Sequence, residues 1–86
     1  MDTYNLIISS PDGHIFDDQV YFLSLRGANG DLAILKDHIP FSTTVKPSKV
    51  KIELKDGTEK YAEIESGILT LSKENTILLS TSFKWK

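Results

Sequence analysis

Short apolar segments with a period of two residues constrain the fold of this chain most. Val50, Ile52 and Leu54 occupy even positions, for example, while lysine and glutamate occupy the odd ones. This spacing is typical of half-buried strands, because successive side chains of a strand point to opposite faces. Turn residues such as those at 10–13 separate the segments. The sequence therefore predicts an all-β fold, a sandwich or flattened barrel, and gives little support for helix.

The expected strands differ in the faces that they bury. Residues 19–25 carry apolar side chains on both faces, which predicts a strand that lies between two layers. Asp17 and Asp18 are expected to form a charged turn before it, and residues 82–86 follow the last expected strand without an identifiable packing partner. The strands are expected at 4–8, 15–16, 19–25, 41–46, two arms of a hairpin over 49–65, 68–71 and 76–81.

The register of the hairpin over residues 49–65 can also be predicted. Its apolar residues fall at even positions on both arms, so directly opposed residues must be even with even. A three-residue loop, 55–57, with Gly57 in a left-handed conformation satisfies this condition, whereas a two-residue turn does not. An exposed cross-strand ion pair at such a position contributes only about 0.2–1 kcal/mol. The opposed pairs are expected to be Val50 with Ala62 and Lys49 with Glu63.

Length and composition exclude several classes of protein. The 86 residues are expected to form one domain, 1–86, with one core and no room for a second folded unit. With no cysteine, disulfides and thiol chemistry are excluded, which suits a reducing cytoplasm. A net charge of −2 gives no long-range attraction to nucleic acid or to an anionic membrane. No apolar run approaches the ~20 residues that span a bilayer, and the amino end lacks a secretory pattern.

Catalysis has little support in the sequence. The nearest hydrolase candidates are Ser42, His38 and Asp37. No nucleophile elbow surrounds Ser42, and adjacent residues of an extended chain point to opposite sides, which is poor geometry for a proton relay. The sequence therefore predicts that the chain is not an enzyme and has no catalytic residue.

Metal and nucleotide sites are equally poorly supported. Neither candidate metal cluster shows the repeated histidine or carboxylate spacing of a preformed site. A phosphate loop at Gly27 and Gly30 would need a following Gly-Lys-Ser/Thr and a helix, and the sequence offers neither. We therefore expect no metal, no cofactor and no small-molecule ligand. The candidate metal clusters are His14 with Asp12, Asp17 and Asp18, and His38 with Asp31 and Asp37.

Residues 25–40 combine two glycines, an acid, an apolar pair and a His-x-Pro at fixed spacing. Glycines there supply positive φ for a tight surface turn, and such a loop can present polar side chains without cost to the core. The stretch resembles the signature loop of the ATP synthase epsilon subunit, roughly Gly-x-x-Gly-acid-Leu-Gly-Ile-Leu-Pro-x-His-x-Pro. Ala33 stands where that family usually has glycine, and Lys36-Asp37 where it usually has proline and a small residue. The residues in register are Gly27, Gly30, Asp31, Leu32, Ile34, Leu35, His38 and Pro40.

The resemblance extends along nearly the whole chain and implies a fold, a site and a role. It implies the family's amino-terminal sandwich of about ten strands, at the foot of the central stalk against the gamma subunit and the c ring. Asp31 would face the polar loops of the c ring, with His38 in the adjoining contact region and Gly30, Leu32 and Pro40 shaping that surface. The implied role is non-catalytic coupling of ring to gamma, so that ion-driven rotation drives ATP synthesis.

The resemblance also implies a location and marks a difference. The domain would lie at the cytoplasmic face of the cell membrane, held there through the synthase. Typical members continue into a carboxyl-terminal pair of helices, which is expected to be absent here because the sequence stops at Lys86. Inhibition of ATP hydrolysis and ATP binding, which depend on those helices, are therefore not transferred to this chain.

Two other readings remain open at the level of sequence. An unrelated β-sandwich that binds a peptide or sugar would need a concave pocket lined by aromatic residues, for which Trp85, Tyr21 and Tyr61 are the candidates. A small hydrolase would show turnover that His38→Ala abolishes.

Overall fold

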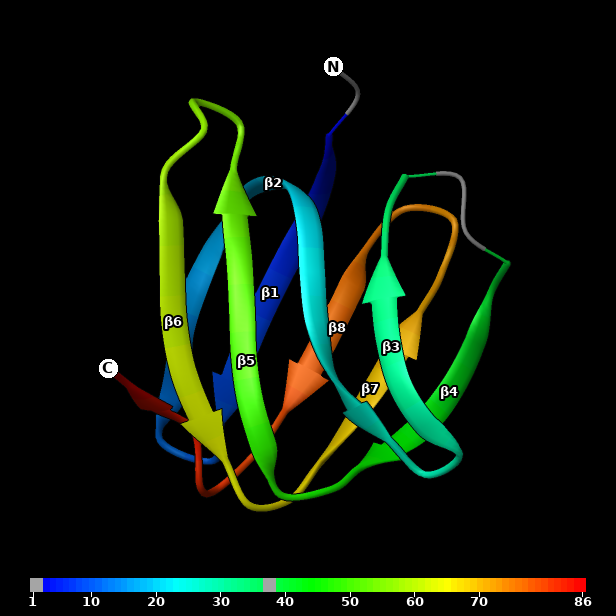
Figure 1. Cartoon of the computed structure of the whole chain (residues 1–86), viewed down its shortest axis with the longest axis vertical. Coiled ribbons are helices and arrows are strands. Elements are labelled where there is room, and N and C mark those ends of the chain that lie inside the picture. The colour runs from blue at the N-terminus through cyan, green and yellow to red at the C-terminus, as the bar shows by residue number, and fades with distance from the viewer. Residues whose placement is uncertain (1–2, 37–38) are drawn as a thin grey trace.

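A computed structural model describes residues 3–36 and 39–86. The regular secondary structure of these residues consists of strands. Within these ranges no helix is long and apolar enough to cross a bilayer. The prediction of an all-β sandwich is confirmed (Figure 1). The nine strands of the described residues are β1 (Tyr4–Ser10), β2 (Gly13–Gly27), β3 (Gly30–Ile34), β4 (Phe41–Val45), β5 (Ser48–Leu54), β6 (Glu59–Ile64), β7 (Gly67–Leu71), β8 (Thr76–Leu79) and β9 (Lys84–Trp85).

The long strand β2 belongs to both layers of the sandwich. Its first half pairs with β1, which lies parallel to β8 and leads through β7 to β4. Its second half lies between β3 and β5, and β6 and β9 continue that layer (Figure 1). A single pair, Gly27 with Val45, joins β2 to β4. The crossing of β2 thus connects the two layers around one core.

Strand β2 departs from the sequence prediction at its acidic pair. Asp17 and Asp18 do not form a turn but continue the strand, opposite Ile7 and Leu6 of β1. Their side chains are exposed, so the strand can carry two adjacent carboxylates without burying charge. The predicted break between two short strands is therefore wrong, because backbone pairing with β1 outweighs the polar local sequence.

A β-bulge explains the apolar side chains on both faces of residues 19–25. The register between β2 and β5 shifts between Val20 and Phe22, so the strand changes the face that it turns to the core. Val20, Leu23 and Leu25 are buried, while Tyr21 and Phe22 are half-buried. The expectation that this strand is covered on both faces is therefore corrected.

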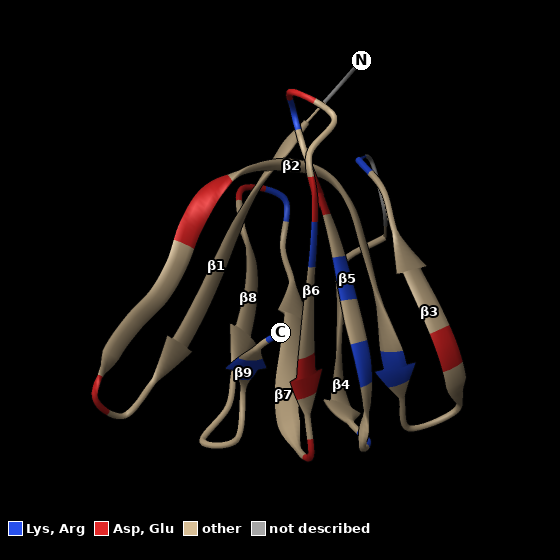
Figure 2. Ribbon diagram, turned by 60° about the vertical axis from the view of Figure 1, so that its left-hand side comes forward, with Lys and Arg blue, Asp and Glu red and all other residues tan. Residues whose placement is uncertain are grey.

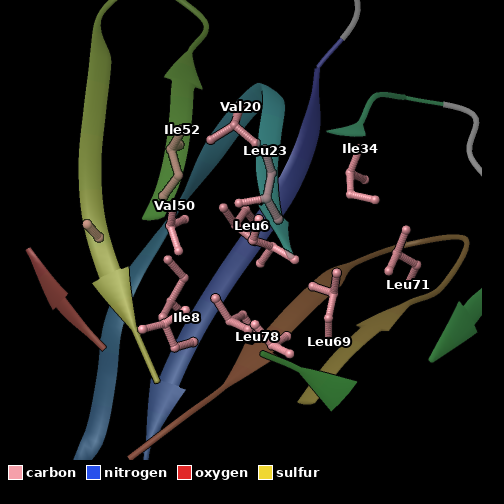
Figure 3. Packing of buried hydrophobic residues seen from close by; sticks show 14 residues of the cluster. Leu6, Ile8, Val20, Leu23, Ile34, Val50, Ile52, Leu69, Leu71 and Leu78 are labelled. Atoms are coloured by element: carbon pink, nitrogen blue, oxygen red, sulfur yellow. The ribbon is translucent and has the colours of Figure 1, made fainter. Parts of the chain in front are cut away.

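The core lies between the two layers, where residues from eight of the strands meet (Figure 3). Its largest fully buried side chains come from both halves of the chain, which fixes the layers against each other. The buried cluster consists of Leu6, Ile8, Val20, Leu23, Leu25, Ile34, Val45, Val50, Ile52, Ala62, Ile64, Leu69, Leu71 and Leu78.

The hairpin of β5 and β6 confirms the predicted register. Val50 lies opposite Ala62 and Lys49 opposite Glu63. Gly57 has φ +91°, and the Leu54 N–H donates to the Thr58 carbonyl at 2.8 Å across the three-residue loop. The ion pair of Glu63, however, is with Lys86 Nζ at 2.7 Å.

The carboxyl-terminal residues have the packing partners that the sequence did not reveal. β9 adds to the edge of β6, with Trp85 opposite Ala62. The indole ring makes edge contacts with Phe16 and Phe83, at centroid distances of 5.7 and 4.9 Å. These contacts come from β2 and from the segment before β9, so only the folded chain brings them together.

Candidate functional site

The glycine stretch folds into the tip of the β2–β3 hairpin. Gly27 and Gly30 form its last cross-strand pair, with residues 28–29 as the turn. Gly30 has φ +127°, a conformation that residues with a side chain rarely adopt. A Cβ on Gly27 would lie 2.7 Å from Leu32 Cδ1, so glycine also permits close packing there. The torsion angle thus favours glycine at position 30, whereas at position 27 the close contact is with the end of a leucine side chain, which can shift.

The segment from β4 to β5 braces this tip. Thr43 Oγ1 accepts a hydrogen bond from the Ala28 N–H at 3.3 Å. The Arg26 carbonyl accepts from the Lys46 N–H at 2.9 Å, and the Arg26 N–H donates to Ser48 Oγ at 3.2 Å. Hydrogen bonds from a neighbouring segment thus hold the backbone on one side of the tip.

A tyrosine from β1 fixes the opposite end of β3. The Tyr4 hydroxyl donates to the Ile34 carbonyl at 2.7 Å, and burial raises the pKa of Tyr4 well above its ordinary value. Tyr4 therefore stays protonated and remains a donor at physiological pH. Both ends of β3 are tied to the rest of the domain.

Asp31 presents its carboxylate at the tip, as part of an ion pair. Its side chain is 79% exposed, and its Oδ1 accepts a hydrogen bond from Arg26 Nε at 3.0 Å. Figure 2 shows a basic segment at the end of β2 beside an acidic segment on β3, in keeping with the register of Arg26 and Asp31. Sequence reasoning missed Arg26, although a two-residue turn between the glycines would have placed it opposite Asp31.

The structure separates the other residues predicted for the site. Gly30 and Leu32 lie beside Asp31 at the start of β3, with Leu32 half-buried against the core. Pro40 is exposed and lies just before β4, beyond the opposite end of β3 (Figure 1). His38 lies outside the described residues, as does Asp37. Gly30 and Leu32 thus lie together with Asp31, while Pro40 lies beyond the other end of β3.

The candidate residues for other chemistry do not gather into a site in the part of the chain described. Ser42 lies on β4 with its hydroxyl bonded to Thr70 Oγ1 at 3.4 Å. No group of histidine, cysteine, aspartate and glutamate among residues 3–36 and 39–86 could hold a metal ion. Tyr61 and Trp85 line a hollow of about 230 Å³, but Tyr21 is not among its lining residues. The three aromatic candidates therefore do not share one pocket.

A second surface, which sequence reasoning missed, lies on the outer face of β7 and β8. Ile68 and Leu79 are directly opposed there, with 50% and 48% of their surfaces exposed. We name this pair, with the half-buried Ile77 beside it, the apolar face. A groove of about 410 Å³ adjoins it, lined also by Pro11 and by Ser9, Ser10, Ser66 and Ser80. Adjacent exposed apolar side chains of this kind are typical of protein contact surfaces.

Known proteins resemble this chain in sequence and in fold. Residues 3–86 match the family model described as "ATP synthase, Delta/Epsilon chain, beta-sandwich domain". The "ATP synthase epsilon chain, sodium ion specific" of Acetobacterium woodii is 34% identical over 84 residues. The match covers 98% of this chain and 63% of that protein, so the chain spans about three fifths of its relative's length.

Solved structures share the fold of this chain. A chain of the Euglena gracilis mitochondrial ATP synthase (OSCP/F1/c-ring) has a TM-score of 0.88 at 15% identity, covering 96% of this chain and 53% of that one. A chain of the Tetrahymena thermophila mitochondrial ATP synthase (central stalk/c-ring) has a TM-score of 0.75 at 12% identity, covering 95% and 66%. At such identities these structures show the fold alone.

The sequence matches identify the family of the chain, which the fold alone does not. The relatives are named epsilon chains of ATP synthase, in line with the prediction that this chain is not an enzyme. The family match covers every described residue and includes the glycine hairpin. The chain therefore belongs to the beta-sandwich domain family of the ATP synthase delta/epsilon chains.

Proposed function

We propose that this domain couples the c ring to the gamma subunit in the central stalk of a rotary ATP synthase. The observation that carries the proposal is the exposed Asp31 carboxylate on a braced hairpin tip. A charge held outward by fixed backbone suits the recognition of polar loops, because little ordering is needed on binding. The Tetrahymena assembly, named for its central stalk and c ring, contains a chain of the same fold.

We assign the apolar face to the gamma subunit. Ile68 and Leu79 lie on the layer opposite to β3, so both contacts can be made at once. Burial of two half-exposed aliphatic side chains stabilises an interface through the hydrophobic effect. Two separate surfaces on one stiff sandwich let the domain transmit torque between its partners.

This arrangement needs no reaction within the domain. Rotation of the ring, driven by ions, would reach catalytic sites on other subunits through gamma, with the domain bound at the cytoplasmic face of the membrane. The proposal thus assigns Asp31, Gly30 and Leu32 to the ring contact. Pro40 remains a proposed contact at the other end of β3, and His38, which lies outside the described residues, remains a proposed contact as well.

Charge reversal at the tip tests the ring contact. Asp31→Lys should weaken binding to detergent-solubilised c ring by about tenfold or more, since like charges across an interface repel. Its melting temperature should stay close to that of the wild type, because a surface charge contributes little to folding. Asp12→Lys, the same charge change on the exposed turn between β1 and β2, is the matched control and should bind normally. Unaltered ring affinity of Asp31→Lys would contradict the site, and a wild type that binds neither ring nor gamma would contradict the function.

A further inference from the structure

The hairpin tip carries an ion pair, Arg26 with Asp31, instead of a single negative charge. We propose that Arg26 is a positioning residue for docking, which orients the Asp31 carboxylate and offers its own outer N–H groups to the same partner. The inference rests on the proposed function, since its partner is the polar loop of the c ring. That loop must then supply a cation for Asp31 and an oxygen acceptor for Arg26.

The geometry of the pair leaves both groups able to bind. In the part of the chain that the structure describes, the contact uses Arg26 Nε and Asp31 Oδ1, at 3.0 Å. Asp31 Oδ2 and the two Nη groups of Arg26 therefore remain for a partner. The arginine side chain is 56% exposed and the aspartate 79%, so neither is enclosed by the domain.

The backbone of Arg26 is held in place, so its side chain can orient the Asp31 carboxylate. Its N–H donates to Ser48 Oγ at the start of β5, and its carbonyl accepts from the Lys46 N–H just before that strand. An exposed ion pair of this kind contributes little to folding. Its effect falls instead on binding, because an aspartate already held in one orientation loses less freedom when a partner docks.

The charge pair also predicts how binding depends on salt. Two opposite charges at the tip cancel at long range, so they do not steer a partner by attraction from a distance. Docking should therefore depend on contact geometry more than on ionic strength. A planar guanidinium, unlike the ammonium of lysine, can bond Asp31 and a second acceptor at fixed angles.

A double-mutant cycle on the full chain tests the inference. Arg26→Gln should weaken binding to detergent-solubilised c ring by about threefold to tenfold. Asp31→Asn should weaken it similarly. The double variant should bind no worse than Asp31→Asn within about twofold, because Asp31 also holds the Arg26 guanidinium in place for the partner, so that loss of either residue removes both contributions. Arg26→Lys should restore only part of the affinity. The control is Lys49→Gln, which removes a cation that lines the same surface hollow as Arg26 and Asp31 and should bind as the wild type does.

The results that would contradict the role of Arg26 differ from the result that would also contradict the proposed function. Loss of binding in Asp31→Asn with wild-type or tighter binding in Arg26→Gln overturns the inference alone, because Arg26 would then only mask the carboxylate. The inference is also overturned if the affinity losses of Arg26→Gln and Asp31→Asn add up in the double variant. A loss of ring affinity in Lys49→Gln as large as that in Arg26→Gln overturns it too. Absence of ring binding by the wild type overturns both. Melting temperatures close to wild type in all variants confirm that the differences arise in binding.

Discussion

Thr76 is a polar residue in a buried position. It is 1% exposed at the start of β8, and its Oγ1 has no hydrogen-bond partner within the described residues. A buried hydroxyl without a partner loses its hydration and gains nothing in return. The residue therefore lowers the stability of the domain relative to an apolar side chain of the same shape.

Replacing this hydroxyl by a methyl group should stabilise the fold. Thr76→Val should raise the free energy of unfolding by about 1 kcal/mol, as read from urea unfolding with an unchanged m value. Thr70→Val on the adjacent strand is the matched control, because Thr70 Oγ1 accepts a hydrogen bond from Ser42 and should give no such gain. A Thr76→Val variant less stable than the wild type would show that the hydroxyl has a partner in solution.

Some requirements on single residues cannot be predicted from the local sequence. The glycine spacing and the family resemblance indicate Asp31, but no local pattern explains why residue 67 is glycine. In the structure a Cβ on Gly67 would lie 2.6 Å from the Leu79 carbonyl oxygen. That requirement comes from a strand twelve residues away, which no local pattern reveals.

At the scale of elements, β9 depends on one ion pair and a few aromatic contacts. Lys86 Nζ lies 2.7 Å from Glu63 Oε1. The hydrogen bond and the charge of Lys86 hold the pKa of Glu63 below its ordinary range. A carboxyl whose pKa is lowered by folding stabilises the folded state above its unfolded pKa, and that contribution is lost as the pH falls through the folded-state value.

Acid should therefore weaken the attachment of β9. Between about pH 6 and pH 3 the wild type should lose stability, and Glu63→Gln should lose less over the same range, because it has no such carboxylate to protonate. Urea unfolding at the two pH values measures the difference. Glu65→Gln, which removes a neighbouring exposed carboxylate, should keep the pH dependence of the wild type. An identical pH dependence in Glu63→Gln would contradict the role of the pair.

Strands and turns were predicted correctly where the alternation of apolar residues and the turn residues determine them. The β5–β6 register followed from alternation and Gly57, because both arms have a clear apolar face. Strand β2 was misjudged because a bulge shifts its phase and two aspartates continue it. The strand β9 was missed because two residues carry no period, and its partners lie far away in the sequence.

At the scale of the whole molecule, the sequence predicted the architecture better than the surface. Alternation gave the all-β class, and the resemblance gave the family. The pairing of Arg26 with Asp31 and the meeting of Ile68 with Leu79 depend on which strands become neighbours. Contact surfaces of this kind emerge only when the topology of the sheet is known.

The central claim is that one sandwich holds the c ring and gamma at the same time through two surfaces. The most direct measurement is capture of detergent-solubilised c ring and purified gamma by the immobilised chain, separately and together. We predict one complex that contains both, with Asp31→Lys losing the ring but keeping gamma and Ile68→Glu losing gamma but keeping the ring. Competition between ring and gamma for the chain, or capture of neither, would contradict the claim.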